Sequence, residues 1–324
     1  MKKSVLVLLA LAVALVATGC SKKTVASASA ATETKTAKLK VGVIQLVEHP
    51  ALDGAYQGFV DGLADAGYKN GENISIDYQN AQGEQANCVT IANKLVNDKD
   101  DLILAIATPA AQAVAQLTQT IPVLITAVTD PESAKLVQSN THPGNNVTGT
   151  SDLTPVSAQI DLLKRVVPNA KTVGLMFCSS EQNSIFQIQL AKDACTRSGL
   201  KYIEGSVSNS NEIQQVTQSL VGKVDAIYVP TDNMLAAGMP LLAQVANEAK
   251  IPTIVGEDGM VKSGGMVTYG INYYELGKQT AAMAVKVLKG EANPADMPIE
   301  YLEKCDLSYN SDSLAKVGIT LPKL

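Results

Sequence analysis

The sequence predicts an α/β protein made of two similar doubly wound lobes that are joined by hinge strands. One observation is that short apolar stretches alternate with longer amphipathic ones, which is typical of a parallel sheet with helices on both faces. Another is that the pattern occurs twice. The stretch from Asp101 matches the one from Asp225, and the stretch from Ile121 matches the one from Ile251, in their order of strand, turn and acidic residue. One large sheet with a chance similarity is the alternative.

The first half of this pattern contains four strands and three helices. Apolar runs predict the strands, and helical spacing of apolar residues, such as Leu52, Tyr56 and Phe59, predicts the helices. Gly67 ends the first helix, and Pro109 stands at a plausible first turn. We expect strands over residues 40–47, 74–79, 101–107 and 121–128, and helices over residues 51–66, 85–97 and 109–119.

The second half repeats the order and ends with a helix that returns to the first lobe. We expect strands over residues 171–178, 200–206, 225–230 and 251–257, and helices over residues 182–198, 211–221, 233–249 and 274–289. Hinge strands are expected near residues 148–153, 266–272 and 299–306. Lobe 1 then comprises residues 39–149 and 273–298, and lobe 2 comprises residues 150–272 and 299–324.

The N-terminus reads as a secretory signal peptide over residues 1–19. Two lysines precede a short apolar run, which ends in small residues before Cys20. This ending resembles a bacterial lipoprotein signal, which implies cleavage before Cys20 and a diacylglyceryl group on its sulfur. An ordinary signal peptide with an incidental Cys20 is the alternative. Residues 20–38 are mostly Ser, Ala, Thr, Lys and Glu, so we expect a flexible tether.

Composition limits the partners of the folded part. The chain is 46% hydrophobic and 18% charged, with a net charge of −5 and no basic run after the tether, so nucleic acid is not expected as a partner. No CxxC is present, which argues against a metal site. A disulfide between Cys178 and Cys195 is conceivable; buried free thiols are the alternative.

Polar residues gather where the predicted strands end, which is where open parallel sheets bind ligands. If the lobes face each other, these segments line one cleft. Each alone also fits a helix cap or a turn. The segments are Glu48-His49-Pro50, Thr108-Pro109-Ala110-Ala111, Thr129-Asp130-Pro131, Ser179 to Ser184, Thr231-Asp232-Asn233 and Glu257-Asp258.

A family resemblance rests on these segments. The runs Glu48 to Asp53, Thr108 to Gln112, Thr129-Asp130-Pro131, Asn183-Ser184 and Pro230 to Asn233, with Gly264-Gly265, resemble those of ABC-transporter substrate-binding lipoproteins of the tryptophan-binding type. The resemblance implies the type I periplasmic-binding-protein fold, with two Rossmann-like lobes and hinge closure. It also implies an aromatic amino acid as ligand: Trp, Tyr or Phe. A sugar, a purine or a branched-chain amino acid is the alternative.

The residues at the strand ends favour an amino acid as ligand independently of the resemblance, because a zwitterion needs an anion site and a cation site close together. Helix N-termini offer free N–H groups to a carboxylate, and we expect this of Thr108, Pro109 and Ala110 and of Ser180, Asn183 and Ser184. Three carboxylates are candidates for the ammonium group: Asp130, Asp232 and Glu257. Asp232 is favoured because Thr231 and Asn233 flank it. Glu48 is a further candidate contact, and His49 a weaker one.

The usual catalytic motifs GxSxG, GxxxxGK[ST] and HExxH do not occur in the sequence. We therefore expect a binding protein without catalytic activity, cofactor or metal. The expected role is that of a monomeric solute receptor, lipid-anchored on the outer face of the cell membrane, which serves the permease subunits of an ABC importer. A carboxylate-pair enzyme and a surface adhesin are the alternatives.

Overall fold

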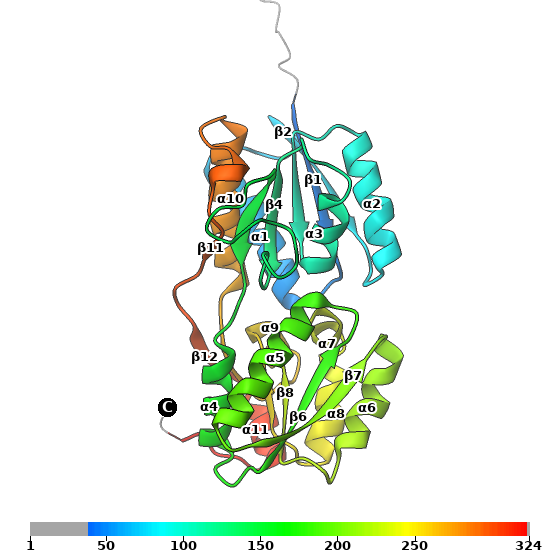
Figure 1. Ribbon diagram of the computed structural model, residues 1–324, viewed down its shortest axis with the longest axis vertical. Helices are drawn as coiled ribbons and strands as arrows, with labels where there is room; N and C mark the ends of the chain where they lie inside the picture. Colours follow the sequence, from blue (N-terminus) through cyan, green and yellow to red (C-terminus); the bar gives the residue numbers. More distant parts are fainter. Residues whose placement is uncertain (1–37, 323–324) are drawn as a thin grey trace, which may run out of the picture. The chain divides into compact units, whose positions relative to one another are not determined.

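The computed structural model describes residues 38–322. The predicted signal peptide, Cys20 and all of the predicted tether except Lys38 lie outside the described residues. Within residues 38–322, no helix combines the length and the apolar character needed to cross a bilayer. The described chain forms two lobes, each built on a six-stranded sheet (Figure 1).

The sheet of lobe 1 is parallel throughout and has the strand order β11-β5-β4-β3-β1-β2. Its central strands β3 and β4 are buried along their whole length. Helices cover both faces, which is why these strands are continuous apolar runs rather than alternating ones. The strands are β1 (Leu39–Gln45), β2 (Ile74–Asn80), β3 (Leu102–Ile106), β4 (Val123–Val128), β5 (Val147–Ser151) and β11 (Glu300–Tyr301).

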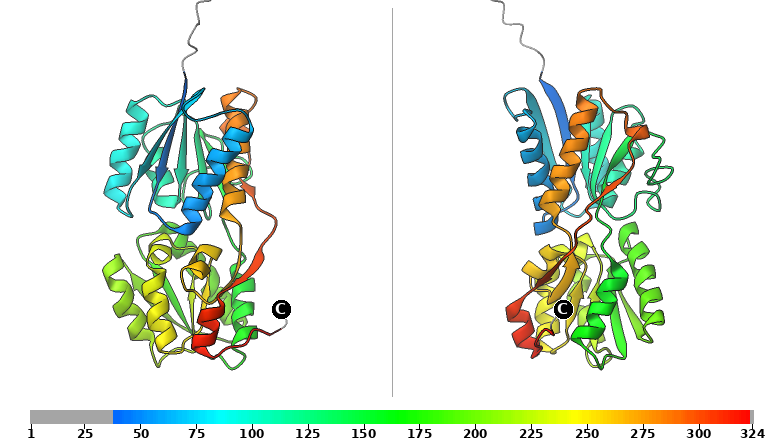
Figure 2. Two further views of the ribbon diagram at one scale, coloured as in Figure 1. Left: turned by 180° about the vertical axis from the view of Figure 1, so that it is seen from behind. Right: turned by 90° about the vertical axis from the view of Figure 1, so that its left-hand side faces the viewer.

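Two helix pairs cover this sheet, α1 with α10 on one face and α2 with α3 on the other (Figure 2). Glycines let α1 and α10 approach closely. A Cβ at Gly58 would lie 1.9 Å from the carbonyl oxygen of Tyr274, and one at Gly277 would lie 2.0 Å from that of Ala55. The helices are α1 (Pro50–Asp65), α2 (Gln85–Asn97), α3 (Thr108–Ala115), α10 (Tyr273–Leu288) and the short η2 (Pro294–Asp296).

The sheet of lobe 2 has the order β12-β10-β9-β8-β6-β7, and only β12 runs antiparallel to its neighbour. Its first five strands in chain order repeat the arrangement of β1 to β5 in lobe 1. The predicted fold class, two similar doubly wound α/β lobes, is therefore confirmed. The strands are β6 (Thr172–Cys178), β7 (Lys201–Val207), β8 (Ala226–Val229), β9 (Thr253–Val255), β10 (Val267–Gly270) and β12 (Asp306–Tyr309).

The helices of lobe 2 correct two sequence predictions. The helix predicted over residues 233–249 is interrupted at Gly238, because Pro240 has no N–H to continue the ladder. The strand predicted over residues 251–257 ends at Val255, and a short helix not predicted from the sequence follows Glu257. The helices are α4 (Val156–Val166), α5 (Gln182–Arg197), η1 (Ser210–Glu212), α6 (Ile213–Leu220), α7 (Asn233–Ala237), α8 (Met239–Glu248), α9 (Asp258–Lys262) and α11 (Ser311–Val317).

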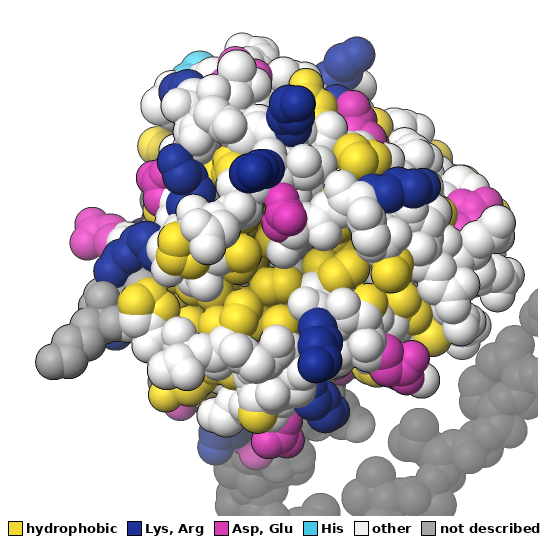
Figure 3. Space-filling model, turned by 90° about the horizontal axis from the view of Figure 1, so that it is seen from below, with side chains coloured by type: hydrophobic (Ala, Val, Ile, Leu, Met, Phe, Trp, Pro, Cys, Tyr) yellow, Lys and Arg dark blue, Asp and Glu magenta, His cyan; other side chains and the backbone are white. Residues whose placement is uncertain are grey.

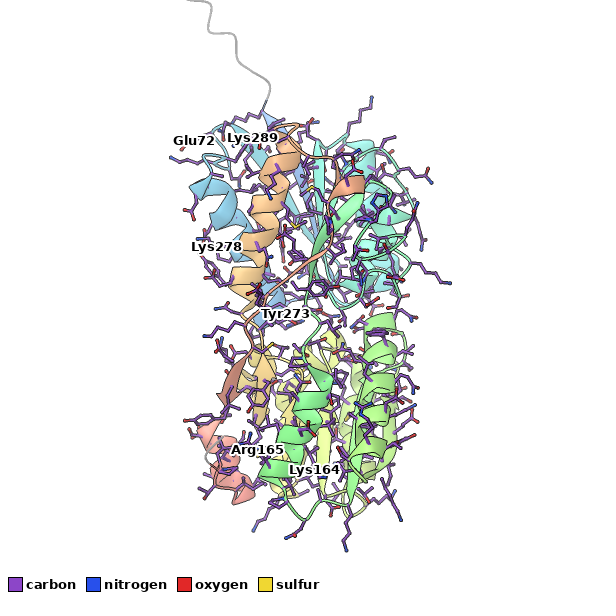
Figure 4. All side chains as sticks on the ribbon, turned by 60° about the vertical axis from the view of Figure 1, so that its left-hand side comes forward. Glu72, Lys164, Arg165, Tyr273, Lys278 and Lys289 are labelled. Atoms are coloured by element: carbon purple, nitrogen blue, oxygen red, sulfur yellow. The ribbon has the colours of Figure 1, made fainter. Side chains whose placement is uncertain are left out.

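The chain passes between the two sheets three times: between β5 and α4, between β10 and α10, and between β11 and β12. Strands β5 and β11 both pair within the sheet of lobe 1. Figure 4 labels Tyr273, the first residue of α10, where the chain enters lobe 1 from the second passage.

Helices α4 and α5 finish with Lys or Arg in their last turns, at the end of lobe 2 that is remote from lobe 1. Seen from that end, Figure 3 shows a band of apolar side chains with Lys and Arg around it. Lys164 and Arg165 lie in the last turn of α4, and Arg197 in that of α5. Cations are favoured at helix C-termini by the macrodipole. The N-termini of α5, α7 and α9 consequently lie at the opposite end of the lobe, towards lobe 1.

The four described cysteines are unpaired. Cys178 and Cys195 are both buried, but they belong to different core clusters of lobe 2. The conceivable disulfide between them is therefore not formed, and the buried free thiols are the arrangement observed.

Candidate ligand-binding site

A small buried cavity lies where the carboxyl ends of the strands in the two lobes meet. About 10 Å³ of it is open to the centre of a water-sized sphere, close to what a single water needs. Lobe 1 and the adjoining passages contribute one part of the wall and lobe 2 the other. The lining residues are His49, Leu52, Ala127, Asp152, Asn183, Thr231, Asp232, Asn233, Ala236, Glu257 and Tyr273.

Glu181, the residue before α5, organises the polar groups of lobe 2. It is buried, and its Oε2 accepts hydrogen bonds from Nδ2 of Asn183 at 3.2 Å, from the backbone N of Asn233 at 3.2 Å and from Nδ2 of Asn233 at 2.6 Å. Its Oε1 accepts from the backbone N of Met234 at 3.0 Å. Two of these donors are the first N–H groups of α7, so Glu181 satisfies groups that the helix itself leaves without partners.

His49 reaches from lobe 1 to lobe 2. Its Nε2 lies 3.4 Å from Oδ1 of Asn233, while its Nδ1 is buried and has no hydrogen-bond partner. Burial lowers the pKa of His49 to about 4, because the charged imidazolium loses its hydration. The side chain is therefore neutral near pH 7.

Three further polar contacts join the lobes. Oγ1 of Thr129 lies 3.3 Å from Oγ1 of Thr231, and Nε2 of Gln187 donates to both, at 3.2 Å and 2.6 Å. Nearer the surface, Nε2 of Gln85 donates to the backbone carbonyl of Ser180 at 3.1 Å. Gln85 and Ser180 line an open groove between the lobes, and Pro109 and Glu181 lie in the same groove. The groove thus reaches Glu181, whose carboxylate hydrogen-bonds Asn183 and Asn233 of the cavity wall.

Asp232 and Glu257 each cap a short helix of lobe 2. Oδ1 of Asp232 accepts from the backbone N of Leu235 at 2.8 Å, its Oδ2 accepts from that of Cys178 at 2.6 Å, and Ser184 also hydrogen-bonds this carboxyl. Glu257 accepts from the first N–H groups of α9. Burial raises the pKa of Glu257 to about 7. Burial, and then the nearby Glu181, raise the pKa of Asp232.

Asp152 differs from these two carboxyls because one of its oxygens is free of protein partners. Its Oδ2 accepts a hydrogen bond from the hydroxyl of Tyr273 at 2.6 Å, but its buried Oδ1 has no partner. Burial raises the pKa of Asp152 to about 6. Both residues stand where the chain passes between the sheets, so the cavity is lined in part by the hinge itself.

The N-terminus of α3 faces lobe 2 without a cap. Its N-cap residue, Ala107, makes no side-chain hydrogen bond, and Oγ1 of Thr108 is buried with no partner. Thr108, Pro109 and Ala110 are all buried, and α3 contacts α5, whose N-terminus is likewise not capped by its N-cap side chain. Two helices whose N-termini are each favourable for an anion thus contact each other across the lobes.

The backbone at the ends of β3 and β4 is strained. Ala107 has φ of +82° and Ala127 has φ of +54°, a region that residues with a Cβ rarely adopt. The register of β4 against β5 also shifts between Ile125 and Val128. Ala127 lines the cavity, and strain of this kind is commonly kept where a ligand site fixes the geometry.

Most of the predicted site residues come together, and two lie apart. Asn183, Thr231, Asp232, Asn233 and Glu257 line the cavity. Pro109 and Ser180 line the groove, Ser184 hydrogen-bonds Asp232, and Thr108 and Ala110 are buried at the start of α3. Glu48 is exposed in the loop after β1 and is not part of the lining. Asp130 accepts hydrogen bonds from the backbone N of Ser133 and from Asn140, and so holds its own loop.

A family model described as "ABC transporter substrate binding protein" matches residues 40–324 of the chain. The chain belongs to this family. Its fold is the type I periplasmic-binding-protein fold, and its class is that of non-enzymatic proteins that bind a small molecule outside the cytoplasm and work with an ABC permease. The expectations for family, fold and absence of catalysis are confirmed by this membership.

A curated relative, named "Tyrosine-binding protein", comes from Clostridioides difficile and is 43% identical over 299 residues, covering 92% of this chain and 86% of the relative. Two solved structures each cover 88% of this chain and 96% of their own. One, an ABC domain from Streptococcus pneumonia in complex with L-Trp, is 40% identical with a TM-score of 0.85. The other, a ligand-free, open substrate binding protein with adhesive properties from Clostridium difficile, is 47% identical with a TM-score of 0.68.

The better superposition on the L-Trp complex runs against the order of sequence identity. Within this substrate-binding protein, hydrogen bonds join the two lobes directly.

Sequence reasoning missed several polar residues of this region. Asp152 lies in a predicted hinge segment and Tyr273 directly follows another, and sequence spacing does not reveal that these positions line the cavity. Glu181 directly precedes α5 and Gln187 lies within it, and the sequence pattern marks neither as different from an ordinary helix residue. The signal available for Glu181 was its place beside Asn183, in a segment already identified as a strand end. His49, which the sequence favours only as a weaker candidate, also lines the cavity.

Proposed function

We propose that this protein is the lipid-anchored receptor of an ABC importer for aromatic amino acids, tyrosine or tryptophan, and that it binds them between its lobes as a monomer. Cys20 would carry the anchor. The names of the Clostridioides difficile relative and of the L-Trp complex support this choice of ligand.

The observation that carries the proposal is a set of buried acceptors without partners around one cavity. Nδ1 of His49, Oδ1 of Asp152 and Oδ1 of Asn183 are all buried and unpartnered. An unsatisfied buried polar group costs about 1–3 kcal/mol. A ligand ammonium group brings three N–H donors and a positive charge, and it would satisfy acceptors of this kind.

Asp152 is the best placed carboxylate for this ammonium. Both oxygens of Asp232 already accept backbone hydrogen bonds, and Glu257 caps α9. One oxygen of Asp152, in contrast, is unpartnered within the cavity wall. Asp232 and Glu257 would then add negative charge from a short distance rather than direct hydrogen bonds.

The ligand carboxylate would lie against the N-terminus of α3. Thr108 offers an unpartnered hydroxyl there, and the adjacent helix start has no side-chain cap. The N-terminal residues Asn183 and Ser184 of α5 approach from lobe 2. The ring would contact the apolar part of the wall, which Leu52, Ala127 and Ala236 supply.

Binding requires the lobes to separate and close again, since the cavity has room for about one water. A ligand that contacts both lobes favours the closed form, because only that form makes both sets of contacts. The hinge residues Asp152 and Tyr273 would couple the ligand directly to this closure.

Calorimetry of the purified full-length protein in detergent, titrated with the twenty amino acids, tests the proposal. We expect binding of L-Tyr or L-Trp with micromolar affinity or better and no turnover. Binding of a sugar or purine in place of every amino acid would contradict the proposed ligand. Loss of membrane association in a Cys20→Ser variant tests the anchor.

Adhesion is a second candidate function, which the description of the Clostridium difficile relative favours. Cell-attachment assays with the Asp152→Asn variant separate the two functions. Attachment that survives the loss of amino-acid binding would indicate a separate adhesive surface, and attachment lost together with binding would indicate that adhesion depends on the ligand site.

A further inference from the structure

Three polar atoms in the cavity wall have no hydrogen-bond partner, and all three are acceptors in the orientations that the structure shows. The atoms are Oδ1 of Asp152, Oδ1 of Asn183 and Nδ1 of His49. A carboxylate oxygen is always an acceptor when ionised, but an amide or an imidazole can present either a donor or an acceptor. Something must therefore fix the orientation of Asn183 and the tautomer of His49.

Glu181 fixes the amide of Asn183. Its Oε2 accepts from Nδ2 of Asn183 at 3.2 Å, and the backbone carbonyl of Thr231 accepts from the same nitrogen at 3.0 Å. Both partners are acceptors only, so the amide nitrogen must point towards them. The amide oxygen is then left on the other side, buried and without a partner in the cavity wall.

Glu181 fixes the second amide, that of Asn233, in the same way. Oε2 of Glu181 accepts from Nδ2 of Asn233 at 2.6 Å, which leaves Oδ1 of Asn233 to face Nε2 of His49 at 3.4 Å. Since that oxygen is an acceptor, Nε2 of His49 must carry the proton. A neutral imidazole has one proton, so Nδ1 of His49 presents its lone pair to the cavity.

We propose that Glu181 is a positioning residue that sets the hydrogen-bonding polarity of the ligand cavity, so that the cavity accepts from its ligand and selects molecules with a primary ammonium group. Glu181 acts through Asn183 directly and through Asn233 on His49. The choice of an ammonium ligand rests on the proposed function; the orientation of the three side chains does not.

The first test observes the tautomer of His49 without any ligand. The chain has two histidines, His49 and His142, so long-range ¹H–¹⁵N spectra of histidine-labelled protein contain two imidazoles, and a His142→Gln variant assigns them. We expect neutral His49 with the proton on Nε2 near pH 7. A proton on Nδ1 in the wild type would overturn the proposal, whatever the variants do.

The second test removes the charge of Glu181 and keeps its shape. In Glu181→Gln the new amide can donate to Oδ1 of Asn233, which allows that amide to turn and the proton of His49 to move to Nδ1. We expect the signal of that tautomer to appear in the variant. The matched control is Glu291→Gln, at an exposed position after α10, which should leave the spectrum of His49 unchanged. An unchanged tautomer in folded Glu181→Gln would overturn the proposal.

The third test compares L-Tyr with 3-(4-hydroxyphenyl)propanoate, which has the same ring and carboxylate but no ammonium. We expect the wild type to prefer L-Tyr by at least about a hundredfold, since a site built to accept from a donor rejects an analogue that lacks it. The preference should fall at least about tenfold in Glu181→Gln. An equal preference in both proteins contradicts the role of Glu181, whereas failure of both compounds to bind contradicts the proposed function and leaves the tautomer tests to decide.

Discussion

Lobe 1 and lobe 2 share a topology but end their corresponding strands differently. After β3 the chain continues into Thr108, and after the corresponding β8 it reaches Asp232. After β4 comes Thr129, and after the corresponding β9 comes Glu257. Both lobes have carboxyl groups at these strand ends, but those of Asp232 and Glu257 line the cavity, whereas that of Asp130 in lobe 1 accepts hydrogen bonds from its own loop. The carboxylates of Asp232 and Glu257 cap their own helices, whereas the N-terminus of α3 has no side-chain cap.

The difference indicates how two similar halves can bind a ligand with two unlike charges. An uncapped helix N-terminus keeps its N–H groups and its partial positive charge available for an anion. The buried carboxyls of lobe 2 and the hinge supply negative charge close to the unpartnered acceptors. Each half thus suits one end of a zwitterion, and neither half alone suits both.

The largest expected effect is that of Asp152→Asn at the hinge. Removing the charge of the acceptor that would face the ammonium should weaken L-Tyr binding about a hundredfold, as for one partner of a buried charged pair. The unfolding free energy at pH 7.5 should stay equal or rise, because burial already disfavours the ionised form. Calorimetry and urea unfolding measure the two quantities. Asp161→Asn, at an exposed position of α4, is the control, and equal affinity in both variants would remove Asp152 from the site.

The second largest expected effect is the change of L-Tyr affinity with pH. Burial raises the pKa of Asp152 to about 6 and that of Glu257 to about 7, so the ammonium group of the ligand must displace protons from these carboxyls below neutrality. Affinity for L-Tyr should fall more than about tenfold between pH 7.5 and pH 5. Calorimetry in buffers of different ionisation enthalpy should detect the released protons, and an affinity that rises at pH 5 would contradict this.

The same shifts have the opposite sign for the stability of the free protein. A carboxyl with a raised pKa favours the folded state at low pH and loses that contribution as the pH rises through 6 and 7. The double variant Asp152→Asn, Glu257→Gln should therefore show a smaller loss of melting temperature from pH 5 to pH 7.5 than the wild type. Asp100 also has a raised pKa of about 6, but it lies away from the cavity, so Asp100→Asn should alter this loss without altering the pH dependence of binding.

Thr108→Val tests the lobe 1 side of the comparison. Loss of the hydroxyl at the start of α3 should weaken L-Tyr about tenfold, while tyramine, which has no carboxylate, should bind both proteins alike. Stability should not fall, because the hydroxyl lost is unpartnered. In the control Thr118→Val, the lost hydroxyl accepts from the backbone N of Ile121, so stability should fall by about 1 kcal/mol and affinity should not change.

The smallest expected effect is that of Gln85→Ala in the groove between the lobes. Its side chain makes a single hydrogen bond to the carbonyl of Ser180 across the lobes, worth about 1 kcal/mol. Dissociation of L-Tyr in stopped-flow fluorescence should be about fivefold faster, with the association rate little changed. Gln57→Ala, on the outer surface of α1, is the control.

The order of strands and helices could be predicted from the sequence because burial on both faces makes each central strand a continuous apolar run, such as Leu102–Ile106. The predicted helices and strands are wrong where a single residue, a proline or a helix cap, outweighs the pattern of apolar residues. Pro240 divides one predicted helix, and Glu257 turns a strand end into the start of α9 by accepting its first N–H groups.

The sequence placed most of the candidate site, since the carboxyl ends of parallel strands meet at one edge of a sheet. Asn183, Thr231, Asp232, Asn233 and Glu257 follow this rule. Glu48 and Asp130 also follow predicted strand ends in the sequence. In the structure, however, Glu48 is exposed, and the carboxylate of Asp130 accepts a hydrogen bond from its own loop. A strand end fixes the neighbourhood of a side chain but not its direction.

The sequence by itself determined the class of this protein, because the repeated α/β pattern and the polar strand ends both depend on neighbours in the chain. Only the tertiary structure decided which groups are short of partners. Asp152 and Tyr273 meet across 121 residues, and Glu181 and Asn233 across 52. Hydrogen bonds at such separations are set by how the lobes pack. Burial raises the free-energy cost of a missing hydrogen bond, because a polar group away from water must find its partner within the fold or in a ligand.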